Sequence, residues 1–249
     1  MSTIDALLQS LNADAPVRHV LAGAFWTAVV LDTTPPRCGL ASTLRSAMHD
    51  DHPSVREAGH LLEYSGRELS ELLRSSSTLE ASVGMAAYNA LLEVDEAACC
   101  EVNAEEVILE HGAGRRVAIV GHFPFTERVR QTAATCWVLE QHPHPGDLPA
   151  GQAAQVLSQA DVVALTGTSL INHTFDDLVR MCRPGAYVLV LGPSTPLSPA
   201  LFDGKVDAVS GTLVTDPERV LRSVAQGATF RQIKRAGGLR LLTRVKGET

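Results

Sequence analysis

The sequence predicts an α/β protein: a Rossmann-like parallel sheet with helices on both of its faces, preceded by a smaller α+β unit. From about residue 104 onward, short and almost continuously apolar segments alternate with amphipathic ones, which is the pattern of a parallel sheet covered by helices. Before that point the chain predicts a helix, three β-prone segments and two more helices. At 249 residues the chain is long enough for two small domains. We therefore expect domains at 1–103 and 104–249.

The smaller domain is expected to begin with a helix. Four apolar residues recur at the spacing of one helix face: Ile4, Leu7, Leu8 and Leu11. This spacing predicts a helix over residues 3–11. Three β-prone segments follow up to about residue 45, and Gly23 and the Pro35-Pro36 pair separate them, which predicts a three-stranded meander. Helical patterns then occupy residues 66–74 and 78–94.

The larger domain is expected to alternate strands and helices. Five segments have the composition of buried strands: 116–121, 135–140, 161–166, 186–191 and 206–214. Helical patterns lie between and after these strands, at 125–132, 150–158, 174–182 and 216–226. The stretch from Phe230 to Val245 predicts a short helix, a Gly-Gly turn and a terminal strand. Trp26 and Trp137 lie in strand-like segments, so we expect both rings in the hydrophobic core.

Composition and charge argue against two classes of partner. The chain has 21 Lys and Arg against 28 Asp and Glu, so its net charge is −7 and no basic stripe is available to neutralise a phosphate backbone. We therefore expect no nucleic-acid partner. The longest apolar stretch, 17–31, is interrupted by Arg18, His19 and Gly23, and the first residues lack the basic segment of a signal peptide. We expect a cytoplasmic protein with no membrane partner.

The five cysteines do not have the spacing of a zinc site, and we expect mostly reduced thiols. Cys136 and Cys182 lie in or beside apolar segments, where a free cysteine packs as a small apolar side chain. The adjacent pair Cys99-Cys100 suits packing as well, and a redox or soft-metal role is the alternative. His49 and His52 flank two aspartates, so they could bind a divalent metal or simply form a polar turn.

Ligands of an open α/β sheet gather at the carboxyl ends of its strands, where loops and helix N-termini meet. Gly121, His122 and Phe123 follow the first predicted strand, and this single glycine differs from the glycine-rich fingerprint of dinucleotide-binding proteins. Glu140 follows the second strand, 19 residues after Gly121, close to the spacing at which a carboxylate binds ribose hydroxyls. A solvated carboxylate at the strand end is the alternative for Glu140.

Two hydroxyl-rich loops follow the third and fourth strands and form the strongest site signal. The first contains the candidate binding residues Thr166, Gly167, Thr168, Ser169, Asn172 and His173. The second fixes its backbone with three prolines and contains the candidates Gly192, Pro193, Ser194, Thr195 and Ser198. Backbone N–H groups and hydroxyls in such loops can bind an anion or a polar group. Helix capping by Thr174 is the alternative reading of the first loop.

Three segments of the chain carry a family resemblance: SVGMAAYNALLE at 82–93, GTSLINHTFDDLV at 167–179 and VLVLGPSTPLSPALFDGKVDAVSGTLVTDP at 188–217. With these motifs the chain resembles the prokaryotic family described as putative heavy-metal chelation proteins, formerly a domain of unknown function. The resemblance extends over nearly the whole chain. It implies an N-terminal domain similar to the enolase N-terminal domain, an atypical Rossmann-like C-terminal domain, and a ligand site in the cleft between them.

The resemblance also implies which positions form that site. The motif positions of the family fall in this sequence at Asn89, Gly121, Phe123, Thr166 to Asn172 and Gly192 to Ser198. His173 follows Asn172 at a position where some relatives have glycine.

The preferred hypothesis is a protein that binds or processes a small polar ligand, either metal-chelating or not, such as a siderophore-like or tetrapyrrole-derived molecule. Five side chains are expected to bind ligand oxygens: Ser169, Asn172, Ser194, Thr195 and, from the other domain, Asn89. His122 and His173 follow strands on the same rim and are expected to recognise polar groups, and a role as general base is the alternative. The cofactor suggested by this hypothesis is a transition metal or its chelate.

Two other functions stay open. The chain could be an enzyme that uses an adenosine-type cofactor, such as S-adenosylmethionine or a nucleotide, with Gly121 and Glu140 at the cofactor site. It could also be a ligand sensor or a homo-oligomeric scaffold without catalytic activity. The sequence does not decide whether the protein is an enzyme.

Overall fold

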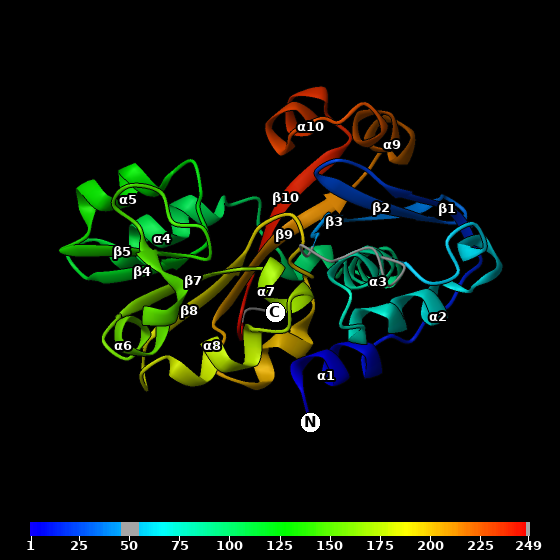
Figure 1. Cartoon of the computed structure of the whole chain (residues 1–249). Helices are drawn as coiled ribbons and strands as arrows, with labels where there is room; N and C mark the ends of the chain where they lie inside the picture. Colours follow the sequence, from blue (N-terminus) through cyan, green and yellow to red (C-terminus); the bar gives the residue numbers. More distant parts are fainter. Residues whose placement is uncertain (46–54, 248–249) are drawn as a thin grey trace.

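Two β-sheets and the helices around them form the fold, seen here in a computed structural model that describes residues 1–45 and 55–247 (Figure 1). The smaller sheet has three antiparallel strands in the order β1-β2-β3. The larger sheet has seven strands in the order β10-β9-β8-β7-β4-β5-β6, and all its neighbours are parallel except β9 and β10. The predicted α/β fold class is confirmed.

The strands are β1 (Val17–Ala22), β2 (Trp26–Leu31), β3 (Arg37–Ser42), β4 (Arg116–Val120), β5 (Thr135–Glu140), β6 (Leu148–Pro149), β7 (Val162–Thr166), β8 (Tyr187–Leu191), β9 (Ala208–Val214) and β10 (Leu239–Val245). The α-helices are α1 (Thr3–Gln9), α2 (Gly66–Ser70), α3 (Thr78–Leu91), α4 (Ala104–Gly112), α5 (Thr126–Thr132), α6 (Ala153–Leu157), α7 (Thr168–Ile171), α8 (Phe175–Met181), α9 (Pro217–Ala225) and α10 (Phe230–Ala236). Short 3-10 helices lie at η1 (Leu61–Glu63), η2 (Glu71–Arg74), η3 (Glu96–Ala98), η4 (Ala150–Gln152) and η5 (Pro199–Asp203).

Helices cover both faces of the larger sheet, as the continuous apolar strands predict. Successive side chains of a strand point to opposite faces. Val117 and Ile119 of β4 therefore pack on one face, together with apolar residues of α4 and α5. Ala118 of the same strand packs on the other face, in a cluster that includes α3, α6 and α8. Parallel pairing of Ala118 with Trp137 and with Val163 aligns β4 with its neighbours β5 and β7.

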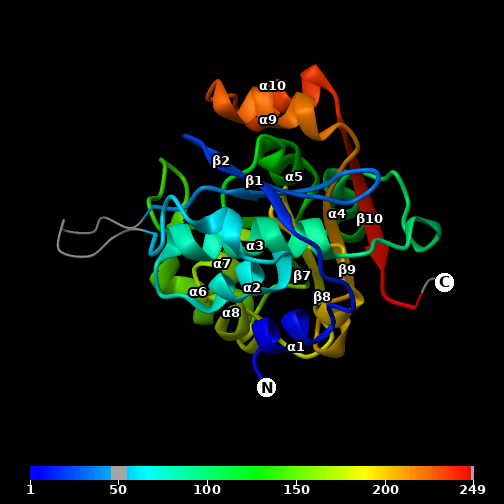
Figure 2. The ribbon, with the colours of Figure 1, turned by 90° about the vertical axis from the view of Figure 1, so that its right-hand side faces the viewer.

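The smaller sheet lies between two layers of helices (Figure 2). One face packs against α3, and the other face packs against α9 and α10 from the end of the chain. On that second face, Val224 and Ile233 belong to the same buried cluster as Ala28 and Leu40. The last part of the chain thus completes the core of the first part.

Helix α3 occupies the centre of the molecule, and its sequence of small residues explains how it fits there. Ser77 begins the helix, because its Oγ accepts a hydrogen bond from the backbone N–H of Glu80 (3.4 Å). Gly39 of β3 allows the helix to lie close to the sheet, since a Cβ at this position would overlap the backbone of Ala86 and Ala90. All but a few residues of α3 are buried.

Several elements differ from the sequence prediction. Helix α4, which Asn103 caps by accepting a hydrogen bond from Glu105 N (3.3 Å), was not predicted, and neither was the short edge strand β6. Helix α7 forms within the first predicted loop. The predicted helix at 66–74 is α-helical only as far as Ser70 and continues as a 3-10 turn.

The predicted domains share one core. The largest cluster of buried apolar side chains contains Met85 and Tyr88 of α3 together with Val163 and Val190 of the larger sheet. The division at residue 103/104 stays a prediction. In residues 1–45 and 55–247, no helix is long and apolar enough to cross a membrane.

Candidate functional site

A cleft of about 650 Å³ opens at the carboxyl ends of β4, β7 and β8, where residues of both sheets and of α10 meet. The loops after these strands contribute His122, Phe123, Thr166, Gly167, Thr168, Gly192, Pro193 and Ser194. The smaller sheet contributes Trp26 and Ser42, the start of α4 contributes Asn103 to Glu105, and α10 contributes Phe230, Arg231 and Lys234. The structure thus brings the two predicted loops together with the residues that follow β4.

The two hydroxyl-rich loops lie against each other along this cleft. Gly167 permits the close approach, because a Cβ at this position would overlap Thr195. Thr166 Oγ1 lies 2.9 Å from Thr168 Oγ1 and accepts a hydrogen bond from Thr168 N (3.3 Å). Thr195 Oγ1 is buried and has no hydrogen-bond partner in the described part of the chain. Thr195 itself does not line the cleft, so its ligand-binding role stays a prediction.

Two glycines turn the chain at the cleft. Gly121 after β4 and Gly192 after β8 have φ angles of +104° and +114°, a conformation that favours glycine. They direct the following residues, His122 and Pro193, into the cleft lining.

Aromatic rings line two sides of the cleft. The ring centroids of Trp26 and Phe230 are 5.3 Å apart, and Phe123 stacks on Phe125 with centroids 5.2 Å apart and planes 11° apart. Trp26 and Trp137 are both half-buried and pack against buried apolar clusters, as expected, and Trp26 also lines the cleft. Large apolar faces with a few polar groups are typical of small-molecule sites.

Three cationic side chains and one carboxylate line the cleft. Arg128 Nη1 lies 2.6 Å from Glu105 Oε1, which pairs these two residues with each other. Arg231 and Lys234 have no ion-pair partner among the described residues, and both are exposed on α10. The cleft therefore has an excess of positive charge, although the chain as a whole carries −7.

His122 is held by a carboxylate. Its Nδ1 lies 3.2 Å from Asp147 Oδ2, and the Asp147 side chain is only 1% exposed. Asp147 also accepts hydrogen bonds from the backbone N–H of His144 (3.2 Å) and from Arg130 Nη2 (3.1 Å). Desolvation alone would raise the pKa of the Asp147 carboxyl, but the hydrogen bonds from His144, His122 and Arg130 outweigh it and lower the pKa. Asp147 is therefore ionised at neutral pH.

Asn89 of α3 faces the second loop, as the sequence hypothesis expects. Its Nδ2 donates hydrogen bonds to Leu40 O (3.0 Å) and to Ser194 O (3.3 Å). Ser194 Oγ accepts a hydrogen bond from Ser42 N (2.8 Å) and donates one to Ser42 Oγ (3.0 Å). These bonds tie the loop after β8 to α3 and β3. A ligand contact for Asn89 stays a prediction.

The remaining predicted residues lie outside the cleft lining and make hydrogen bonds within the protein. Ser169 Oγ donates to Thr166 O (2.7 Å), and Ser198 Oγ caps η5 through Ala200 N (3.3 Å). The carboxylate of Glu140 accepts a hydrogen bond from the next backbone N–H (3.0 Å). Asn172 Oδ1 accepts one from Thr174 Oγ1 (2.7 Å). Their ligand-binding roles, and the adenosine-type cofactor, stay predictions.

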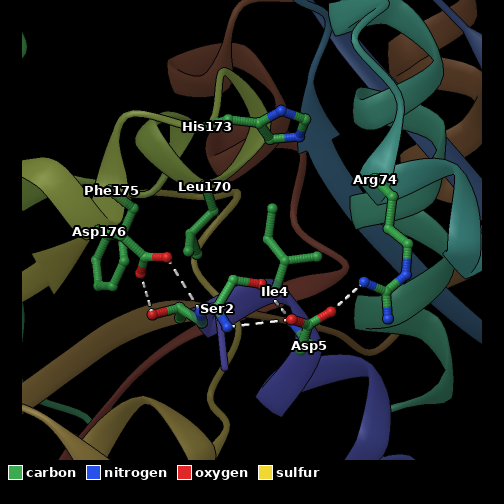
Figure 3. A pocket seen from close by; sticks show the side chains of 9 residues that line it. Ser2, Ile4, Asp5, Arg74, Leu170, His173, Phe175 and Asp176 are labelled. Carbon is green, nitrogen blue, oxygen red and sulfur yellow. Dashed lines mark hydrogen bonds and ion pairs between the residues drawn. The ribbon is translucent and has the colours of Figure 1, made fainter.

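His173 belongs to a second pocket, of about 340 Å³, formed by the start of α1, Arg74 and the start of α8 (Figure 3). Its Nε2 lies 2.8 Å from Leu73 O, and its backbone φ is +61°. Arg74 forms an ion pair with Asp5 in this pocket. His122 and His173, which were expected on one rim, therefore line different pockets.

Two family profiles, both described as putative heavy-metal chelation, match the chain at residues 4–92 and 103–243. The second match alone spans more than half of the chain. The chain belongs to the putative heavy-metal chelation family. The resemblance drawn from three sequence segments is confirmed.

Solved structures of this family have the same fold. A protein with unknown function from the DUF364 family of Desulfitobacterium hafniense DCB-2 is 25% identical, with 98% of this chain and 97% of that chain covered and a TM-score of 0.84. Its counterpart from Pyrococcus horikoshii is 19% identical, with 98% of each chain covered and a TM-score of 0.83. An uncharacterised protein of Methanocaldococcus jannaschii is 24% identical over 161 residues, which are 62% of this chain and 62% of the relative. The match thus spans less than two thirds of that relative's length.

The description of the family raises the question of which side chains could bind a metal ion. Within residues 1–45 and 55–247, no group of three or more His, Cys, Asp or Glu side chains could hold a metal ion. All five cysteines are free: Cys38, Cys99, Cys100, Cys136 and Cys182. His49 and His52 lie outside the described residues.

Sequence reasoning missed the aromatic and cationic side chains that α10 brings to this site. A signal was present, because Arg231 and Lys234 have the i, i+3 spacing of one helix face and Phe230 precedes them. This spacing does not by itself indicate a binding site, because α10 lies far along the chain from the loops it faces. Asp147 was missed for the same reason, since its partner His122 is 25 residues away.

Proposed function

We propose that the protein binds a heavy metal as a complex with a small organic anion, and that this complex occupies the cleft. The proposal rests on one observation: the contacting rings of Trp26 and Phe230 line the same cleft as Arg231 and Lys234, two cations without an ion-pair partner among the described residues. A metal chelator offers what such a cleft recognises, namely conjugated rings and carboxylate or catecholate oxygens.

The donor set supports a chelate over a bare ion. Carboxylate oxygens of a bound chelator remain hydrogen-bond acceptors, and Arg and Lys bind them through charge-assisted hydrogen bonds. The hydroxyls of Thr166 and Thr168 lie at the same cleft and can bind further ligand oxygens. The volume of about 650 Å³ falls within the range of small-molecule sites, roughly 300–1,000 Å³.

A titration with two inert cobalt(III) complexes tests the proposal. Bis(dipicolinato)cobaltate(III) is an anion with aromatic chelate rings, and hexaamminecobalt(III) is a cation with the same metal and oxidation state. Isothermal titration is expected to show saturable 1:1 binding of the anion and none of the cation. Equal binding of both complexes, or none of the anion, would refute the proposal.

Charge variants locate the binding. Arg231→Gln and Lys234→Gln are each expected to weaken the anionic complex about three- to tenfold, since each removes one charge-assisted contact. Arg235→Gln is the matched control, because Arg235 is exposed on the same helix but does not line the cleft. Its affinity should equal that of the parent protein.

A further inference from the structure

The imidazole of His122 lines the cleft and contacts a buried carboxylate. The ring lines the cleft and its side chain is 43% exposed, yet Nδ1 lies against a carboxylate that is almost completely buried. His122 alone among the described imidazoles combines a buried carboxylate partner with a place in the cleft.

The carboxylate is itself held firmly. Asp147 Oδ1 accepts a hydrogen bond from Arg130, and Oδ2 accepts one from the backbone N–H of His144 as well as facing His122. Three donors from three places along the chain therefore fix its position. A group fixed in this way can fix the ring that donates to it.

The contact with Asp147 determines which ring nitrogen is free. An ionised carboxylate can only accept a hydrogen bond, so Nδ1 of His122 must carry the proton. In the neutral ring, Nε2 then has the lone pair. Nε2 of His122 has no hydrogen-bond partner in the part of the chain that the structure describes. Histidines that ligate metals almost always donate their other N–H to a carboxylate, a carbonyl or a water molecule.

One free imidazole nitrogen is too few ligands for a bare metal ion, but it suits a chelate with an open coordination position. The ring of His144 lies with its centroid 5.1 Å from that of His122, but His144 does not line the cleft. From these contacts we infer that His122 Nε2 ligates the metal of the chelate directly and that Asp147 is its positioning residue. This inference rests on the proposed function, and it adds a coordinate bond to the contacts of Arg231 and Lys234.

Copper(II) bound by one dipicolinate tests this inference, because that complex leaves an equatorial position open. Electron spin-echo envelope modulation detects the remote nitrogen of an equatorial imidazole. With half an equivalent of the copper complex, the parent protein is expected to show this modulation. Excess bis(dipicolinato)cobaltate(III), which has no open position, should remove it by displacing the copper complex from the cleft.

Two histidine variants test whether the imidazole modulation comes from His122 or from other histidines. His122→Gln should lose the imidazole modulation and bind copper–dipicolinate at least tenfold more weakly. His60→Gln is the matched control, because His60 Nδ1 also lies 2.8 Å from a carboxylate, that of Glu63, but the pair is exposed and outside the cleft lining. It should keep the modulation. Unchanged modulation in His122→Gln would overturn the inference even if the cobalt anion binds normally.

Asp147→Asn tests the positioning role. It is expected to weaken copper–dipicolinate about tenfold, as loss of a ligand's hydrogen-bonded partner does at metal sites. Its affinity for bis(dipicolinato)cobaltate(III) should stay at the parent value, because that complex cannot accept a nitrogen ligand. Equal weakening of both complexes would indicate a merely structural role for Asp147. If the parent protein binds neither complex, the proposed function fails and the role of His122 fails with it.

Discussion

The Tyr88 hydroxyl on α3 donates a hydrogen bond to Ser198 Oγ over 3.0 Å and so joins the central helix to the loop that follows β8. Tyr88 is completely buried, and its hydroxyl also lies 3.1 Å from Ser10 Oγ at the end of α1. Burial raises the pKa of Tyr88, although the hydrogen bonds with Ser10 and Ser198 work in the other direction. One phenol thus connects three segments that are distant along the chain.

Tyr88→Phe is expected to lower the free energy of unfolding by about 1–2 kcal/mol, because it removes the hydrogen bonds of a buried phenol with Ser10 and Ser198. Urea denaturation measures this change. Tyr64→Phe is the control, since Tyr64 is only half-buried and its hydroxyl makes no hydrogen bond with the described residues; it should match the parent protein. An unchanged midpoint for Tyr88→Phe would contradict the role assigned to this contact.

Gly39→Ala is expected to lower the free energy of unfolding by about 3 kcal/mol or more. The added methyl group would overlap backbone atoms of α3 that cannot move independently. Gly151→Ala has no atom within 4 Å of its new methyl group and is the matched substitution. Thermal unfolding followed by circular dichroism compares them. Equal melting temperatures for both variants would show that α3 can move away from β3.

The thiols are expected to differ in reactivity. Desolvation raises the pKa of Cys38 to about 12 and those of Cys136 and Cys182 to about 11, so at pH 8 almost none of these groups is a thiolate. Cys100 is exposed and should react first with iodoacetamide. Peptide mapping by mass spectrometry identifies the order, and labelling in urea should reach all five cysteines. Fast labelling of Cys38 in the native protein would be inconsistent with its burial.

Asp161 should make stability depend on pH. Hydrogen bonds from the side chain and backbone of Arg116 hold the pKa of this carboxyl well below its usual value, and Arg183 adds to the effect. Because the folded-state pKa is lowered, the stabilisation is present above the unfolded-state pKa, about 3.9, and is lost as pH falls below it. Asp161→Asn is expected to lower the free energy of unfolding by about 2 kcal/mol at pH 7, and by less at pH 3.

Urea denaturation of both proteins at the two pH values tests this sign. Asp177→Asn is the control, because Asp177 forms an exposed ion pair with Arg180 one helical turn away. Such pairs contribute little to stability. The ion-pair explanation would be incompatible with a difference in free energy of unfolding between Asp161→Asn and the parent protein that is as large at pH 3 as at pH 7.

The fold was predictable from the sequence because each strand carries its own signal. Strands β4, β7 and β8 are almost wholly apolar, and the chain between them has helical periodicity, so a covered parallel sheet follows from local patterns. Trp26 shows the limit of this reasoning. Its neighbours in β2 are buried, but its ring meets Phe230 at the cleft, a contact that no local pattern contains.

The site was predictable in part for a similar reason. The carboxyl ends of parallel strands must lie together, so Thr166 and Ser194 could be expected on one edge of the sheet. Ser198 could not be told from a binding residue, because its partner is a tyrosine 110 positions earlier. The ring of His173 likewise lies in the other pocket, and the only sequence sign of its left-handed backbone is the glycine of some relatives at this position.

The packing of α9 and α10 on the smaller sheet has a consequence for how the chain is made. A ribosome releases the sheet well before the helices that cover Ala28 and Leu40, because α9 and α10 follow it by about 175 residues. Until these helices emerge, the nascent chain exposes an apolar face that the folded protein covers. Such surfaces are prone to aggregation, so chaperones should matter most for this protein before α9 and α10 have emerged.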